Sequence, residues 1–314
     1  AHDFAAVAQA VSLRTRIPFL HFFDGFRTSH EMRDYQRLSD RDLAALMDET
    51  DVLSHRKRGL TPDRPVIRGT SQNPDVFFQG RERTNERYAS LPAALSGAFD
   101  LLADATGRRY SLVEYSGHPE AEDVLVIMGS GGETAVETTL ALQVDGAKIG
   151  TLQLRLYRPW PEEAFLQALP ATTRRIAVLD RTKEPGSLGE PLCLDVTSTL
   201  QRAGKQIDVV GGRYGLGSKE FTPAMVSAVF DALSAGRLPR GFTVGIEDDL
   251  SQSSIPVPPE FHVEAPDTTR AVFYGLGSDG TVGATKSSVS ILHDAGLHAQ
   301  GYFVYDSNKA GSQT

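Results

Sequence analysis

Hydrophobic residues in the first third of the chain recur mainly at helical spacing. Phe4, Val7, Ala8 and Val11 fall on one face of a helix expected over 4–13, and the short aromatic run 17–23 (IPFLHFF) is typical of a buried strand. Ser39 is expected to cap a helix over 38–49, and Gly107 to end another over 88–106. The polar segment 68–83, which contains Asn-Pro, is interpreted as a long loop, and 110–115 as a strand.

From residue 122 onward, short apolar runs alternate with helical segments. The expected strands are 124–128, 149–156, 175–180, 207–210 and 242–249. Helices are expected between them, one ending near Leu142 and one running from the Thr222-Pro223 cap to about Leu233. This alternation predicts an α/β fold of parallel-sheet, three-layer domains.

The last part of the chain contains a glycine-rich stretch. A Ser- and Pro-rich segment over 251–267 is interpreted as a linker, and the run 271–274 as a buried strand. Gly275, Gly277, Gly280 and Gly283 follow, and 287–292 has a pattern compatible with a helix. Backbone N–H groups and a helix N-terminus at such a turn favour an anion such as phosphate.

Two phosphate templates can be tested on this stretch. A P-loop requires Gly-Lys-Ser/Thr, but Lys286 follows Thr285, so that template fails. The spacing of Gly275, Gly277 and Gly280 matches G-x-G-x-x-G, and a second apolar run, 301–305, ends at Asp306, as in a dinucleotide-binding unit. Lys309 would suit a phosphorylated ribose or the phosphates of coenzyme A. A tight, solvated turn without a ligand is the remaining interpretation.

Polar loops after other expected strands are weaker candidates. Residues 24–31, with Asp24, Arg27, Ser29, His30 and Glu31, either form an active-site loop or, as we favour, a turn in which Ser29 caps the next helix. The charged residues of 180–188 (Asp180, Arg181, Lys183 and Glu184) are expected to pair with one another. Arg213 and Lys219, among four glycines, would either hold an anion or shape an interdomain turn.

Composition excludes several classes of protein. The 314 residues suffice for two or three domains, and a net charge of −8 argues against wide contact with nucleic acid. No run approaches the roughly 18 apolar residues of a membrane-spanning helix. The single Cys193 excludes a disulfide within the chain or a cysteine-ligated iron–sulfur cluster. A cytoplasmic location is therefore expected.

The chain opens on Ala1 with a helix already under way, so it is interpreted as a fragment of a longer polypeptide.

Seven sequence blocks, in order, resemble the central part of the pyruvate:ferredoxin (or flavodoxin) oxidoreductase family. They are PFLHFFDGFRTSHE (18–31), GTSQNPDVFFQGRE (69–82), LYRPW (156–160), AVLDRTKEPGSLGEPL (177–192), GGRYGLGSKEFTPAMV (211–226), FTVGIEDD (242–249) and GLGSDGTVGATKSS (275–288). The resemblance implies three parts: the end of a thiamine-pyrimidine-type domain over 1–112, a transketolase C-terminal-like domain over 113–268, and the start of a gamma-type domain over 269–314.

The resemblance also implies an activity. The family oxidatively decarboxylates pyruvate with thiamine diphosphate, passes electrons through [4Fe-4S] clusters to ferredoxin or flavodoxin, and transfers the acetyl group to coenzyme A. It places coenzyme A at the stretch that here is Gly277, Ser278, Asp279, Gly280 and Thr281, with Lys309 nearby. Of these, Asp279 is the weakest assignment, because a carboxylate would repel phosphate unless it is turned away or used on a ribose or amide.

The same resemblance implies what this chain lacks. The glutamate that the family uses with thiamine and the residues that hold pyruvate belong upstream of Ala1, and the cysteine clusters belong downstream of Thr314. No catalytic residue or metal ligand is therefore assigned in this chain. The isolated chain is expected to be inactive, and the complete protein to be a homodimer that does not bind membranes. The alternatives are an oxidoreductase for another 2-oxo acid, a nicotinamide-binding protein that uses Asp306, and a non-catalytic interaction module.

Overall fold

The computed structural model of the protein describes residues 1–67, 69–248, 250–258, 261–265 and 267–305, except for the side chain of Arg27. The chain forms two compact units. The first unit comprises 1–22, 37–114 and 154–168, and the second comprises 23–36, 115–153 and the described part of 169–314. The domain boundaries expected at 112/113 and 268/269 stay predictions.

The first unit is helical. Its helices are α1 (His2–Thr15), α3 (Asp40–Leu46), α4 (Glu49–Lys57), α5 (Pro74–Glu82), α6 (Thr84–Thr106) and α8 (Glu162–Ala168). Helices α1 and α3 pack against α6, around buried side chains that include Val7, Leu46, Leu95 and Leu102. Two predicted helix boundaries are confirmed. Ser39 caps α3 in a capping box, and Gly107 ends α6 in the left-handed conformation that glycine adopts without a steric penalty.

Two sequence-based expectations in and next to this unit are wrong. Residues 17–23 form no strand, and the Leu20 side chain is 86% exposed, because an apolar run becomes a strand only where a neighbouring strand completes its hydrogen bonds. The expected loop over 68–83 contains helix α5. Asn73 is its N-cap residue and Pro74 its first residue, so the Asn-Pro pair, which supported the loop interpretation, is a helix start.

A six-stranded sheet with the order β1-β3-β2-β4-β5-β6 lies mainly in the second unit; the first two residues of β1 and the last residue of β3 are assigned to the first unit. The strands are β1 (Val113–Gly117), β2 (Asp123–Met128), β3 (Ile149–Leu154), β4 (Arg175–Asp180), β5 (Asp208–Arg213) and β6 (Phe242–Thr243). Strands β2, β4, β5 and β6 pair in parallel. Hydrogen bonds from Arg155 N to Leu112 O and from His118 N to Ile149 O show that β1 runs antiparallel to β3. The predicted α/β class with a mainly parallel sheet is confirmed.

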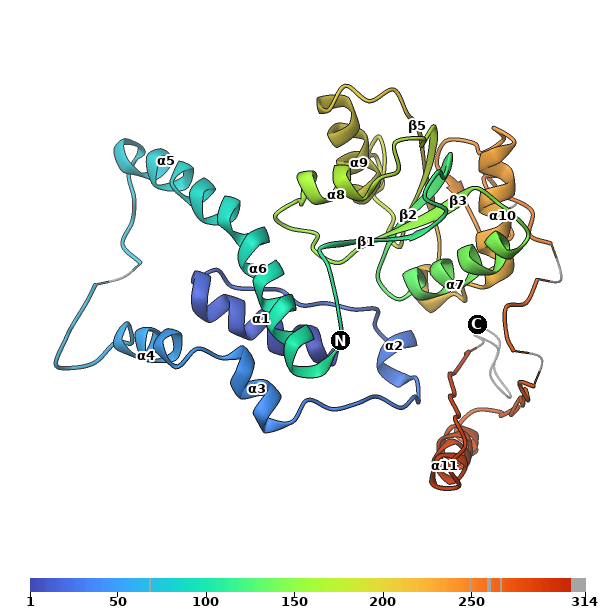
Figure 1. Cartoon of the computed structure of the whole chain (residues 1–314), viewed down its shortest axis with the longest axis horizontal. Coiled ribbons are helices and arrows are strands. Elements are labelled where there is room, and N and C mark those ends of the chain that lie inside the picture. The colour runs from blue at the N-terminus through green and yellow to red at the C-terminus, as the bar shows by residue number, and fades with distance from the viewer. Residues whose placement is uncertain (68, 249, 259–260, 266, 306–314) are drawn as a thin grey trace. The chain divides into compact units, whose positions relative to one another are not determined.

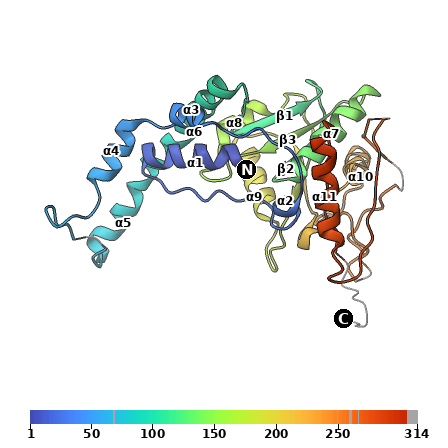
Figure 2. The ribbon, with the colours of Figure 1, turned by 90° about the horizontal axis from the view of Figure 1, so that it is seen from below.

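Helices cover both faces of this sheet. Helices α7 (Gly131–Val144) and α10 (Pro223–Ser234) contact each other on one face, and α9 (Pro191–Arg202) packs against β4 and β5 from the other, as Figures 1 and 2 show. Alternate residues of each strand point to opposite faces. Accordingly, Leu125 and Ile127 of β2 share a core with Ala135 of α7 and Val229 of α10. Thr222 accepts a hydrogen bond from Met225 N, which confirms the predicted cap of α10.

The end of the second unit departs from expectation. Strand β6 is only two residues long, and the expected linker is partly structured, since Ile255 is buried in the core beside β6. Residues 271–274 form no strand, and of the run 301–305 only Gly301 forms a β-bridge, with Met32. Helix α11 (Thr281–Asp294) begins six residues before the expected helix at 287. Among the described residues, no helix is both long enough and apolar enough to cross a membrane.

Candidate functional site

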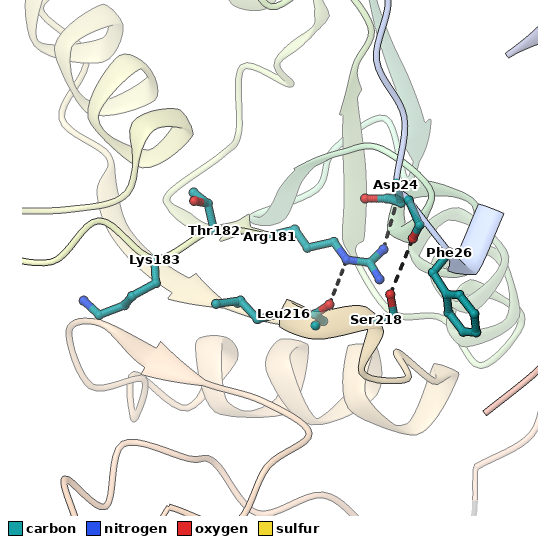
Figure 3. Close-up of a pocket in the computed structure, with 10 residues that line it drawn as sticks. Asp24, Phe26, Arg181, Thr182, Lys183, Leu216 and Ser218 are labelled. Atoms are coloured by element: carbon teal, nitrogen blue, oxygen red, sulfur yellow. Dashed lines mark hydrogen bonds and ion pairs between the residues drawn. The ribbon is translucent and has the colours of Figure 1, made fainter. Parts of the chain in front are cut away.

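An open cleft lies at the carboxyl edge of the parallel strands of the second unit. From β2 the chain crosses to β3 on one side and then to β4 on the other, so the direction of winding reverses between β2 and β4. Open α/β sheets bind ligands at such a point, outside the carboxyl ends of the strands. The cleft, of about 670 Å³, is lined by three segments, shown in Figure 3: 24–26, 181–183 after β4, and 215–218 after β5.

A carboxylate of the chain itself occupies the glycine turn between β2 and α7. Asp24 Oδ2 accepts a hydrogen bond from Ser130 N at 2.8 Å and lies 3.1 Å from Arg181 Nη1. Gly129, at φ 81°, leaves room for it, because a Cβ at this position would lie 3.3 Å from the same oxygen. The turn at 130–133, which resembles a phosphate-binding turn in sequence, therefore binds an internal anion.

Arg181 joins all three segments of the cleft. Its Nε donates to Gly215 O at 2.9 Å, and its Nη1 donates to Ser130 Oγ at 3.0 Å. The side chains of Arg181 and Asp24 are only 15% and 17% exposed, so their attraction is less screened by water than that of a surface pair. Sequence reasoning singled out Asp24 and Arg181 separately but did not pair them, because 157 positions separate them. The usable signal was that each follows an expected strand.

Two residues at the rim of the cleft have strained backbone conformations. Phe26 has φ 58° and ψ −64°, and Ser218 has φ 63°, a region that side chains with a Cβ rarely adopt. Ser218 Oγ donates to Gly25 O at 3.4 Å. Ser29 does not cap a helix as expected; it lies inside the short helix α2 (Arg27–His30), with its hydroxyl 3.0 Å from His30 Nδ1. The strained residues thus border the same opening as the Asp24–Arg181 pair.

The charged loop after β4 does not pair within itself, contrary to expectation. Asp180, at 1% exposure, accepts hydrogen bonds from Leu192 N and Cys193 N at the start of α9, and burial raises its pKa to about 6. Lys183 and Arg213 instead lie near Glu190, at 3.7 and 3.1 Å. The parallel strands bring these groups together from outside the loop, which local sequence does not reveal. Arg213, a candidate anion ligand, forms an ion pair with Glu190.

Of the predicted coenzyme A residues, 277–280 form a loop directly before α11, and Thr281 is the first residue of that helix. Gly277 and Gly280 both have positive φ, and Gly280 is the N-cap residue of α11. The Asp279 carboxylate turns back onto the loop: Oδ2 accepts from Leu276 N at 2.8 Å, and Oδ1 accepts from Thr281 N at 3.0 Å and Thr281 Oγ1 at 2.7 Å. These hydrogen bonds lower the pKa of the Asp279 carboxyl to about 2, and the bond from the Thr281 hydroxyl makes the largest contribution. Lys309, the remaining coenzyme A candidate, and Asp306, the candidate of the dinucleotide-binding alternative, lie outside the described residues.

The dinucleotide-binding alternative lacks its structural context. The G-x-G-x-x-G fingerprint functions at a turn directly after a strand. Residues 271–274 form no strand in the structure, and the side chain of Tyr274 is exposed. Within the described part of the chain, no group of three or more His, Cys, Asp or Glu side chains could hold a metal ion.

Comparison with known proteins identifies the family. Residues 1–99 match the model described as pyruvate flavodoxin/ferredoxin oxidoreductase, thiamine diphosphate-binding, and residues 121–226 match pyruvate:ferredoxin oxidoreductase core domain II. A putative pyruvate-flavodoxin oxidoreductase of Synechocystis sp. is 56% identical over 100% of this chain, which covers 26% of that protein. The pyruvate-flavodoxin oxidoreductase of Rhodospirillum rubrum is 54% identical over 100% of this chain, which covers 27% of that protein.

A solved structure of 2-oxoglutarate:ferredoxin oxidoreductase from Magnetococcus marinus aligns with 55% of this chain and 27% of its own, at 19% identity and a TM-score of 0.35. The curated relatives named above are about four times as long as the segment that they share with this chain. The resemblance inferred from the seven sequence blocks is confirmed: this chain belongs to the pyruvate flavodoxin/ferredoxin oxidoreductase family.

Proposed function

We propose that the protein that carries this chain oxidatively decarboxylates pyruvate, forms acetyl-CoA and passes the electrons to flavodoxin or ferredoxin. The observation that carries this proposal is identity above 50% over the entire chain to relatives named for pyruvate and flavodoxin. Thiamine diphosphate is the cofactor expected with 1–99, from the description of the matching family model. The iron–sulfur clusters would be held by cysteines other than Cys193, the one cysteine of this chain.

Within that reaction, we assign coenzyme A to the loop at 277–281. Glycines at positive φ allow a phosphate to approach the backbone, and the start of α11 adds the favourable end of a helix dipole. Ser278 offers a hydroxyl and Lys309 a positive charge. Asp279 would serve this site by holding the shape of the loop, or by accepting a bond from a ribose hydroxyl or an amide, because its two oxygens already face three donors of the loop.

The reaction is tested by pyruvate-dependent reduction of a viologen dye. The complete protein loaded with thiamine diphosphate is expected to reduce the dye only when pyruvate and coenzyme A are both supplied, and the 314-residue chain alone is expected to give no turnover. Turnover with a different 2-oxo acid but not with pyruvate would refute pyruvate as the substrate. Turnover by the isolated chain would refute its expected inactivity. Light scattering on the same preparation tests the proposed homodimer.

The loop assignment is tested by calorimetric titration with coenzyme A at low salt, with NAD and NADP as comparisons. Replacing Lys309 or Ser278 by alanine is expected to weaken coenzyme A binding by about tenfold each, since each removes one charged or polar contact to phosphate. Lys286→Ala is the matched control: this cation lies in α11 but faces the Phe303 ring at 5.8 Å. Binding of a nicotinamide dinucleotide in place of coenzyme A would contradict the assignment.

A further inference from the structure

We propose that Asp24 and Arg181 are positioning residues for the glycine loop at 277–281. They fix segment 23–36 to the carboxyl edge of the sheet, and this segment in turn holds helix α11, which begins at the loop. The proposal rests on the proposed coenzyme A contact for its functional meaning. Its mechanical part, the placement of α11, depends only on contacts within the second unit.

The first link joins segment 23–36 to the sheet. Asp24 Oδ2 is held by Ser130 N and by Arg181 Nη1, and both partners belong to turns that follow central strands. Arg181 is itself fixed by Gly215 O and Ser130 Oγ. A partly buried pair held by further hydrogen bonds has one geometry, and removing one partner leaves the other poorly solvated. Arg33, whose Nη1 lies 3.1 Å from Glu133 Oε2 of α7, adds an exposed contact farther along the segment.

The second link joins segment 23–36 to α11 and to the residues that follow it. Met32 and Gly301 exchange two backbone hydrogen bonds, of 2.8 and 2.9 Å. Asp34 Oδ2 lies 2.9 Å from His293 Nδ1 of α11, and the Phe26 and Tyr305 rings meet edge to face with their centroids 5.0 Å apart. A small cavity of about 150 Å³ is lined by 32–34 and by the end of α11.

Helix α11 has little packing of its own to hold it. Every residue of α11 is described, and Val289 alone is buried. Gly301 brings its backbone against this helix, because a Cβ there would lie 3.1 Å from Val289 Cγ2. The segment after α11 makes a further contact, a hydrogen bond from Tyr302 Oη to Glu220 Oε1 at 2.9 Å. Segment 23–36 therefore contacts the C-terminal half of α11 and the residues that follow it, and through this helix it would orient the loop at the N-terminus of α11.

Hydrogen exchange on the 314-residue chain tests the mechanical part. Asp24→Ala is expected to speed amide exchange in 281–294 by about tenfold while the strands stay protected, because it frees a locally docked segment. Asp24→Asn keeps an acceptor for Ser130 N and should have a smaller effect. Asp34→Asn removes the exposed carboxylate that lies 2.9 Å from His293 Nδ1 and 3.9 Å from His298 Nδ1, and it should also speed exchange in α11. Lys148→Gln, which removes the exposed ion pair with Glu120 in the same unit, is the control.

Unchanged exchange of α11 in Asp24→Ala and Asp34→Asn would overturn the proposal. Should Asp24→Ala fail to fold, Asp34→Asn and Arg181→Lys, both milder changes, decide the question. Arg181→Lys retains the charge that attracts Asp24 but loses the guanidinium fork, so partial loosening is expected.

Steady-state kinetics on the complete protein test the functional part. Asp24→Asn and Arg181→Lys are expected to raise the KM for coenzyme A by several-fold, with the KM for pyruvate within about twofold of the unmodified protein. Equal effects on both substrates would contradict a specific positioning role. If α11 loosens but coenzyme A binding does not change, the coenzyme A assignment fails and the mechanical link stands. If α11 does not loosen, the link itself fails.

Discussion

At the residue scale, Asp180 is the buried acid with the most direct consequence for stability. It lies at the end of β4, accepts two backbone N–H bonds from α9, and has its pKa raised by burial from 3.8 to about 6. Between these two values the folded chain binds more protons than the unfolded chain. The free energy of unfolding is therefore expected to fall as the pH rises from about 4 to about 6.

Asp180→Asn should remove this contribution. Urea unfolding of both proteins at several pH values is expected to show the stability of the unmodified chain, relative to the variant, falling by on the order of 2–3 kcal/mol between pH 4 and pH 7. Asp231→Asn, at an exposed position of α10, is the control for replacing an aspartate by asparagine outside the core. Parallel profiles for the unmodified chain and Asp180→Asn would show that burial does not perturb this carboxyl.

Two glycines should respond to the same substitution with opposite signs. Gly97 lies in α6 with no atom near the position of an added Cβ, so Gly97→Ala is expected to stabilise the chain by about 0.5–1 kcal/mol. At Gly131 an added Cβ would lie 2.6 Å from Oη of the buried Tyr214, so Gly131→Ala is expected to destabilise it by roughly 1–3 kcal/mol. Thermal unfolding measures both, and equal shifts would contradict this difference in packing.

Local signals at single residues were readable from the sequence, and long-range partners were not. The caps formed by Ser39 and Thr222, and the left-handed Gly107, depend on residues a few positions away and were predicted correctly. The Asp24–Arg181 pair depends on which strands become neighbours in the sheet. A single sequence does not give the order of the strands in the sheet, so both residues were noted as candidates but their ion pair was not predicted.

At the element scale, the sheet was predictable where strands support one another. Strands β2 and β4, buried on both faces, match the expected ranges to within one residue. The runs 17–23 and 271–274 have the same apolar character but form no strands, since hydrophobicity marks a strand without supplying its hydrogen-bonding neighbour. The candidate loop at 277–281 was found from its glycines, whereas the inward turn of Asp279 could only come from the structure.

Helices α4 and α5 are the elements with the weakest packing in the first unit. Neither contains a buried residue, and the Phe78 side chain of α5 is 70% exposed. Segments with few buried contacts open at low free-energy cost. Trypsin is therefore expected to cut the native chain first after Arg56, Lys57 or Arg58, at the end of α4, and much later after Arg175 of β4. Mass spectrometry of the early fragments identifies the sites, and first cleavage within the sheet would contradict this ranking.

At the scale of the whole molecule, the chain contains two units with separate cores. The helical unit is centred on side chains such as Leu102, and the α/β unit on side chains such as Ile127; both are fully buried. Two compact units need not unfold together, and two-state behaviour often fails in chains of several units. Calorimetry of the 314-residue chain is therefore expected to show two unfolding transitions.

Core substitutions assign each transition to its unit. Leu102→Ala leaves a cavity in the helical unit and should lower only one transition, and Ile127→Val removes one methylene from the α/β core and should lower only the other. The expected costs are roughly 2–5 kcal/mol for Leu102→Ala and about 0.5–1.5 kcal/mol for Ile127→Val, in proportion to the volume removed. A single transition shifted by both substitutions would mean that the two cores unfold as one cooperative body. In that event the effect of Asp180→Asn would have to be assigned to the whole chain, because the α/β unit would have no separate unfolding equilibrium.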